Sequence, residues 1–226
     1  EAACNEVKDV LGLPPERVAR IPLLMAPPRS YLCREPAQLP ALTRRPLFLC
    51  VAQLIPRKNI GTLLTAAKLV KEEGLEFSVW IAGTGPLADE LVSQRDRLEL
   101  QDVVEFLGPI QYSSIGFAYE ACDVYVLPTH YDYRSISVLE AMRFGKPILD
   151  SRGDGSAGDL IRHGLNGFIF DPTNPKELAE QMSIMIQQPD LRRRMGESSA
   201  KDSEVYSHEV SARELARLIG RCQRDG

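Results

Sequence analysis

The sequence has no long apolar run and no excess of positive charge. No stretch approaches the roughly 18 apolar residues of a membrane-spanning helix, and the start, EAACNEVKDV, lacks the pattern of a signal peptide. The 31 Asp and Glu residues outnumber the 27 Lys and Arg residues, which gives a formal net charge of −4. A surface that binds nucleic acid needs a net basic face, so we expect no nucleic-acid partner.

Cysteine and histidine are also scarce. The five cysteines have no CxxC spacing, and two of them, Cys50 and Cys122, fall in apolar runs where we expect them to be buried. The three histidines and the acids show no metal-ligand spacing. We therefore expect a reduced, cytoplasmic protein that needs neither a metal nor another cofactor.

Short apolar runs do recur, and they alternate with stretches of helical periodicity. Their continuous apolar character predicts strands that are buried on both faces. Repeated strand–helix alternation predicts the α/β class with a doubly wound parallel sheet, whose ligands bind at the carboxyl ends of the strands. The predicted strands are 47–54, 77–82, 103–107, 124–128, 147–150 and 167–170.

The two ends of the chain differ from this middle part. The first 45 residues are rich in proline, contain one short helical stretch at 5–11, and are interpreted as a linker region. After Pro175 the periodicity is helical to the end. Because the chain begins without methionine, we expect it to be a piece of a longer protein.

The loops after the first two strands contain candidate binding residues. Lys58 follows the first strand and could meet a phosphate as a point charge, although a solvated lysine is the more common case. Gly83 and Gly85, in AGTGP, would let the backbone approach a ligand, but a tight turn needs the same residues. Neither loop is decisive alone.

The loop after the fourth strand, HYDYRSISVLE, carries two acids, Asp132 and Glu140, at the predicted start of a helix. Unpaired backbone N–H groups and the helix dipole make such a start a site for an anion. The alternative is structural, since Ser137 and Glu140 have the spacing of a capping box. From this stretch alone the structural interpretation is favoured.

Three segments, AGTGPL, EACDVYVLPTHYDYRSISVLEAMRFGKPIL and HGLNGFIFDP, have the order and spacing typical of retaining glycosyltransferases of family 4. The chain resembles that family over nearly its whole length. The family has the GT-B architecture of two Rossmann-like domains that face a cleft, and this chain resembles the carboxyl-terminal, donor-binding half. The resemblance implies a remnant of the preceding domain plus linker at 1–45, a Rossmann-like nucleotide-sugar-binding domain at 46–206 and a carboxyl-terminal helix at 207–226.

The resemblance also implies roles for the candidate acids and the lysine. In a Glu-x7-Glu motif the first carboxylate contacts a hydroxyl of the donor sugar and the second binds the ribose, and the matching positions here are Asp132 and Glu140. Lys58 matches the family's phosphate lysine. These three are the candidate catalytic residues, and we expect Lys58→Ala to weaken diphosphate binding more than stability, because a loop lysine has little core to lose.

The remaining implied contacts bind the donor mainly through backbone. The N–H groups of Arg134, Ser135 and Ile136 would bind the diphosphate. The segment Leu107–Ile110, which includes Gly108, resembles the one that holds the base. Gln53 stands where the family has a second phosphate-binding cation, an arginine, and Asp132 is one methylene shorter than the usual glutamate.

The resemblance implies a hexosyltransferase that moves a sugar, with retention of configuration, from a nucleoside-diphosphate-sugar to a glycan, lipid or small-molecule acceptor. The missing amino-terminal domain would bind the acceptor and could provide a peripheral membrane contact, so the isolated chain should be inactive. Two alternatives remain. One is a catalytically silent nucleotide-sugar-binding module, consistent with Gln53 and Asp132; the other is a GT-B sugar-nucleotide epimerase.

Overall fold

The computed structural model describes residues 10, 25, 28–31, 39–40 and 44–222, so the helix predicted at 5–11 lies outside the described residues except for Val10. The chain divides into two compact units. One comprises Pro27–Asp202, and the other comprises residues 1–26 together with 203–226. The predicted boundaries at 45/46 and 206/207 stay predictions.

The larger unit is built on a six-stranded, entirely parallel sheet, as predicted. The strand order is β3-β2-β1-β4-β5-β6, so the direction of winding reverses between β1 and β4. This order is that of the doubly wound Rossmann-like fold. The strands are β1 Leu47–Val51, β2 Ser78–Ala82, β3 Val104–Gly108, β4 Val124–Leu127, β5 Ile148–Ser151 and β6 Gly167–Phe170.

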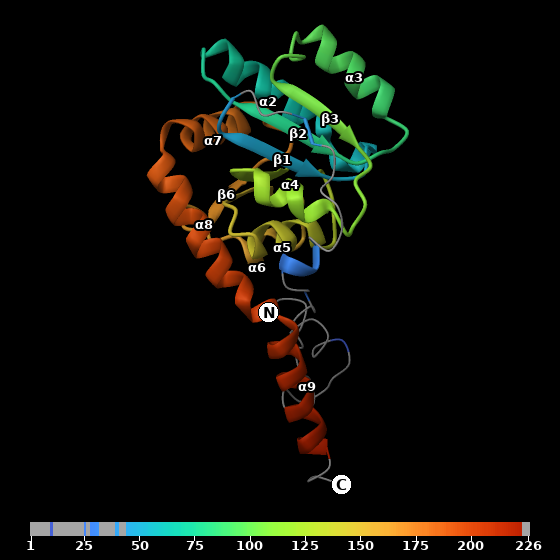
Figure 1. Cartoon of the computed structure of the whole chain (residues 1–226), viewed down its shortest axis with the longest axis vertical. Helices are drawn as coiled ribbons and strands as arrows, with labels where there is room; N and C mark the ends of the chain where they lie inside the picture. The colour runs from blue at the N-terminus through green and yellow to red at the C-terminus, as the bar shows by residue number, and fades with distance from the viewer. Residues whose placement is uncertain (1–9, 11–24, 26–27, 32–38, 41–43, 223–226) are drawn as a thin grey trace. The chain divides into compact units, whose positions relative to one another are not determined.

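Helices cover both faces of the sheet (Figure 1). On one face lie α2, α3 and α7, with α2 and α7 packed against each other, and on the other lie α4 and α5. The bounds are α2 Ile60–Glu72, α3 Ala88–Arg97, α4 Ile115–Ala121, α5 Ile136–Arg143, α6 Ala157–Leu160, α7 Pro175–Gln187 and α8 Pro189–Ser203, with short 3-10 helices η2 at Pro28–Tyr31 and η3 at Pro56–Lys58.

Burial explains why the strands are continuously apolar. The side chains of β2, β4 and β5 are buried along their whole length because helices pack on both faces. Cys50 and Cys122 are free and buried, as predicted. One departure from the apolar pattern is Asp150, a fully buried carboxylate in β5.

The smaller unit contains the 3-10 helix η4 at Glu204–Tyr206 and helix α9 at His208–Cys222. Met25 pairs with Ser207 through a parallel bridge, and its N–H donates to the carbonyl of Tyr206. The chain is therefore helical to the end of the described part, as predicted from the periodicity after Pro175.

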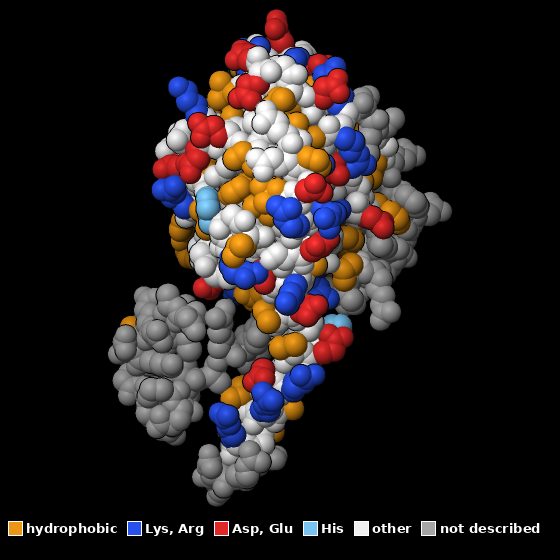
Figure 2. All heavy atoms as spheres, turned by 90° about the vertical axis from the view of Figure 1, so that its left-hand side faces the viewer, with side chains coloured by type: hydrophobic (Ala, Val, Ile, Leu, Met, Phe, Trp, Pro, Cys, Tyr) orange, Lys and Arg blue, Asp and Glu red, His pale blue; other side chains and the backbone are white. Residues whose placement is uncertain are grey.

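The charges on the surface and the polarity of the helices can be compared with the sequence predictions. Figure 2 shows positive and negative side chains interspersed on the face that it displays. Within the described part of the chain, no helix is both long enough and apolar enough to cross a membrane.

Candidate functional site: the carboxyl ends of the strands

Two loops meet where the direction of winding reverses. The loop after β1 carries η3, and the loop after β4 leads into α5. Because β1 and β4 are adjacent and parallel, the segments that follow them leave the same edge of the sheet next to each other. The amide of Asn59 donates to the carbonyl of Pro128 at 3.0 Å and ties the two loops together.

The first cluster at this edge joins these loops and consists of Arg57, Lys58 and Asp132; we call it the Lys58 cluster. Lys58 Nζ donates to Asp132 Oδ2, and Arg57 Nη1 approaches the same oxygen at 3.0 Å. Only 10% of the Lys58 side chain and 13% of the Asp132 side chain are exposed. Lys58 is thus a buried, paired cation, and the alternative of a solvated lysine is wrong.

Asp132 is a stable anion in this setting. Its burial alone would favour the neutral acid, but hydrogen bonds and the positive charges of Lys58 and Arg57 outweigh that effect and lower its pKa. Ser135 Oγ also donates to Asp132 Oδ2, at 3.3 Å. Ser135 is the N-cap residue of α5, and its side chain makes no capping hydrogen bond.

The second predicted acid, Glu140, is buried on α5 and does not cap the helix. Tyr119 on α4 donates its hydroxyl hydrogen to Glu140 Oε2 at 2.7 Å, and Ser137 instead accepts a hydrogen bond from Tyr125. The capping-box interpretation is therefore wrong. Burial raises the pKa of Glu140, and hydrogen bonds from Tyr119 and Tyr112 only partly oppose it.

Glu140 lines a pocket of about 370 Å³ at the carboxyl ends of β1 and β2, which we call the carboxyl-end pocket. Its volume falls within the usual range for small-molecule sites, roughly 300–1,000 Å³. Four predicted site residues from four separate segments share its wall. They are Gln53, Gly83, Ile110 and Glu140.

The other predicted residues lie around this pocket rather than on its wall. The carbonyl of Gly108 accepts a hydrogen bond from the N–H of Gly83 at 2.8 Å, and Gly108 has a positive φ of 67°. Arg134, Ser135 and Ile136 lie at the start of α5, where Arg134 is half-buried, Ser135 is buried and Ile136 is exposed. The structure thus places the predicted residues at one edge of the sheet, in two neighbouring groups.

The glycines of AGTGP have a structural explanation of their own. A Cβ atom at Gly83 would lie 1.9 Å from the carbonyl oxygen of Ala52, and one at Gly85 would lie 2.4 Å from that of Leu54. Both distances are far shorter than any real contact, so the loop after β2 needs glycine to pack against the loop after β1. This packing forms one side of the carboxyl-end pocket.

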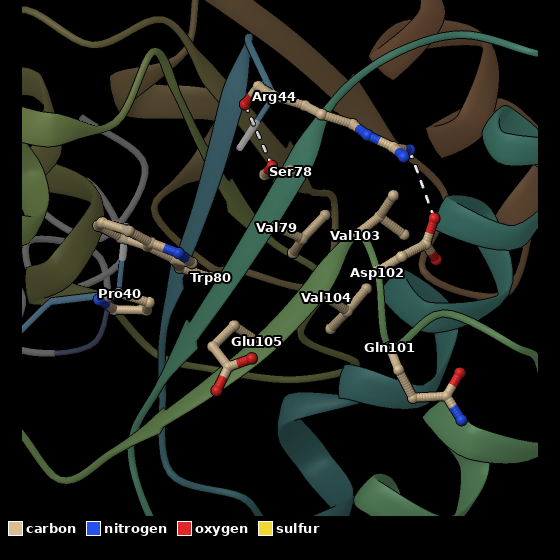
Figure 3. Close-up of a pocket in the computed structure, with 10 residues that line it drawn as sticks. All are labelled: Pro40, Arg44, Ser78, Val79, Trp80, Gln101, Asp102, Val103, Val104 and Glu105. Carbon is tan, nitrogen blue, oxygen red and sulfur yellow. Dashed lines mark hydrogen bonds and ion pairs between the residues drawn. The ribbon is translucent and has the colours of Figure 1, made fainter. Parts of the chain in front are cut away.

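A second cavity, of about 400 Å³, lies at the opposite end of the strands (Figure 3). It surrounds the starts of β2 and β3, where Ser78 donates to the Arg44 carbonyl at 3.1 Å and Arg44 pairs with Asp102 at 3.4 Å. It includes no predicted site residue. Ligands of open α/β sheets bind at the carboxyl ends of the strands, so we assign the function to the other edge.

Sequence reasoning missed three contributors to the site. Tyr119 holds Glu140, Tyr112 lines the carboxyl-end pocket, and Asp150 is fully buried in β5. Burial, reinforced by the nearby Asp154, raises the pKa of Asp150 well above its usual value. A charged residue inside an apolar strand, PILD, was the signal for Asp150; nothing in the sequence shows where the tyrosine hydroxyls point.

The acids and histidines of the described residues do not form a group of three or more that could hold a metal ion. In the Lys58 cluster the one acid, Asp132, is paired with two cations. The expectation that the protein needs neither a metal nor another cofactor stays a prediction.

The family model of the group 1 glycosyl transferases matches residues 34–202, which include both loops and the carboxyl-end pocket. The chain belongs to this family. A relative along 96% of the chain is the alpha-D-kanosaminyltransferase of Streptomyces kanamyceticus, which is 26% identical and is covered over 57% of its length. The chain spans about half the length of the curated relatives it matches.

Two solved structures are similar in fold to this group 1 glycosyl transferase chain. Anabaena Alr3699/HepE in complex with UDP is 22% identical, with a TM-score of 0.70 over 78% of this chain and 49% of that chain. The carboxyl-terminal domain of a group 1 family glycosyl transferase from Francisella tularensis is 18% identical. It has a TM-score of 0.69 over 81% of this chain and 100% of that chain. Both likenesses agree with the predicted Rossmann-like fold.

Proposed function

We propose that this chain is the donor-binding half of a retaining, family 4 glycosyltransferase that transfers a hexosyl group from a nucleoside-diphosphate-sugar. The observation that carries the proposal is the convergence of two groups at one sheet edge. A pocket of nucleoside size lies next to a buried cation beside a helix start. The pocket suits the nucleoside, the cation and the helix start suit the diphosphate, and Asp132 beside them suits a hydroxyl of the sugar.

In this proposal the nucleoside occupies the carboxyl-end pocket. The segment at Gly108 and Ile110 lies against the base, and Glu140 accepts hydrogen bonds from the ribose hydroxyls. Tyr119 donates to Oε2 of Glu140 and fixes that side of the carboxylate. A carboxylate that is already held on one side is preorganised for this contact.

The diphosphate is proposed to bind Lys58 and the N–H groups at the start of α5, Arg134, Ser135 and Ile136. Negative charge grows on the leaving diphosphate in the transition state, and a fixed cation with a helix dipole stabilises it without a metal. Lys58 is paired with Asp132 before the ligand binds, so the diphosphate must share this cation. Asp132 is then proposed to accept a hydrogen bond from a hydroxyl of the donor sugar.

Calorimetry of this chain with UDP, GDP, CDP and ADP tests the donor site. We expect one diphosphate to bind and Lys58→Ala to weaken it by about tenfold, the low end for a charge-assisted contact, because the pair with Asp132 already offsets part of the gain. Lys176→Ala, an exposed lysine with the same change of charge, is the control. No heat with any of the four would contradict the proposal.

The ribose contact has its own test. Glu140→Gln keeps the shape and can still accept from Tyr119, but it loses the anionic acceptor that ribose hydroxyls favour. We expect unchanged or higher thermal stability and weaker diphosphate binding. Equal affinity in the variant and the parent would remove Glu140 from the donor site.

A nucleotide-sugar-binding module without transfer is the second candidate. It is favoured by the pairing of Lys58 with Asp132 and by Gln53, which leaves an exposed neutral side chain on the pocket wall in place of a cation. Product analysis of the full-length protein with the donor that binds separates the two. A transferred sugar supports the transferase, whereas donor binding without any product supports the module.

A further inference from the structure

The loop after β4 carries two exposed tyrosines, Tyr131 and Tyr133, on either side of Asp132. Tyr131 is 52% exposed and Tyr133 is 82% exposed. The ring centroids are 5.1 Å apart and the rings meet edge to face at 70°. Large aromatic side chains are usually buried or grouped at binding surfaces, so an exposed pair beside a candidate site is informative.

The backbone that presents the two rings is held in place on both sides. The N–H of Asp132 donates to the carbonyl of Gly153 at 3.0 Å, and the N–H of Gly155 donates to the carbonyl of Asp132 at 2.9 Å. A Cβ atom at Gly155 would lie 2.7 Å from the Tyr133 carbonyl, so glycine permits this close approach. The tyrosines therefore project from a fixed segment rather than from a free loop tip.

The loop has two different sides. The Asp132 side chain points inward to Lys58 and Arg57, while the residues before and after it are exposed. Side chains of successive residues in extended backbone point to opposite sides, which explains the alternation. The inward side thus carries the charges that suit the donor, and the outward side carries two aromatic rings.

We propose that Tyr131 and Tyr133 form a platform for a sugar ring of the acceptor; this inference rests on the proposed glycosyl transfer. The apolar C–H face of a pyranose suits the electron-rich face of an aromatic ring. The tyrosine hydroxyls can bond the sugar's own hydroxyls, and a side chain with two rotatable bonds is ordered at low entropic cost. The outward position beyond Asp132 is where an acceptor would approach a donor sugar.

The area of the two rings suits a sugar ring. Two tyrosine side chains bury at most about 300–500 Å² together. Contacts between domains of one chain bury about 600–1,500 Å². The platform is therefore sufficient for a sugar ring and too small to hold a facing domain by itself.

Saturation-transfer NMR tests the platform on this chain with UDP present. The probes are the methyl α-glycosides of glucose, galactose, mannose and N-acetylglucosamine. We expect at least one to bind, with transfer strongest to its ring C–H protons. Removing both rings (Tyr131→Ala with Tyr133→Ala) should weaken binding of that probe by about twofold to tenfold for each ring.

Two matched variants define the result. The double Tyr→Phe change at positions 131 and 133 keeps the rings and should retain most of the binding. Leu165→Ala, which shortens an exposed apolar side chain elsewhere, should change nothing. Probe binding that survives removal of both rings, or no probe binding at all while UDP binds, overturns the platform and leaves the donor proposal intact.

The other occupants give different results. If the double Tyr→Ala variant loses affinity for UDP-glucose but not for UDP, the rings bind the donor sugar and the acceptor assignment is wrong. If hydroxyl-radical footprinting of the full-length protein finds both rings protected without any sugar, a protein surface covers them and the inference is also wrong. If no nucleoside diphosphate binds the parent, the proposed function fails first.

Discussion

Replacing Lys58 with alanine should destabilise the fold as well as weaken ligand binding. The change leaves the buried Asp132 carboxylate with Arg57 at 3.0 Å, the Ser135 hydroxyl at 3.3 Å and the Tyr133 N–H at 2.9 Å as partners. Leaving a buried charge entirely without a partner costs about 3–5 kcal/mol. Because Arg57 remains but is 44% exposed and screened by water, we expect a smaller cost of about 2 kcal/mol.

A loss of this size is readily measured. In a chain of this length about 2 kcal/mol lowers the melting temperature by about 4–8 °C. Thermal unfolding followed by circular dichroism gives the shift, and Lys176→Ala corrects for the change of net charge. A Lys58→Ala variant that melts like the parent would show that the Lys58–Asp132 pair contributes nothing and would restore the original expectation of a lysine with little to lose.

The pH dependence supplies a second check on the same pair. The pKa of Asp132 is lowered in the folded chain, so its contribution to stability is complete above its usual value of 3.8 and is lost as the pH falls through the lower folded value. The stability difference between the parent and Lys58→Ala should therefore shrink in urea titrations carried out below about pH 4. A difference that is independent of pH would contradict the role of the carboxylate charge.

Three further predictions concern other parts of the site. Tyr119→Phe removes the hydrogen bond that favours ionised Glu140, so the pKa of Glu140 should rise and the pH profile of diphosphate binding should move upward; an unmoved profile would exclude a positioning role. Gly83→Ala should cost more than about 4 kcal/mol because its Cβ would overlap a carbonyl, whereas Gly158→Ala, which meets nothing within 4 Å, should melt at or above the parent temperature. Asp150→Asn should gain stability over the parent between about pH 5 and about pH 8, because the raised pKa of Asp150 makes the parent lose stability as the pH rises above 3.8; equal slopes would show that Asp150 does not titrate there.

The sequence predicted the sheet because the relevant signal is local. Each strand of a sheet covered on both faces is a short, continuous apolar run, and the alternation with helical periodicity leaves one economical arrangement. All six runs became strands, and the parallel order and the edge that carries the loops follow from this alternation. The prediction of buried Cys50 and Cys122 rests on the same apolar runs.

The site was predicted at the level of segments and of residue types. Lys58, Asp132 and Glu140 were singled out from loops after strands and from a spacing typical of a family, and all three lie at the predicted edge. Their partners could not be predicted, because a partner on another segment depends on how two loops converge. In the sequence Lys58 looks like a solvated loop residue, yet in the structure it is buried and paired with Asp132, 74 positions later.

Tertiary structure alone decided between the capping box and a free acid at Glu140. The spacing of Ser137 and Glu140 is the same in both cases. The outcome depends on Tyr119, which arrives from α4 and takes the carboxylate away from the helix start. Sequence thus determined the fold class and the residues available for chemistry, whereas the charge state and the hydrogen-bond partners of these residues depend on distances and burial that only the packed chain defines.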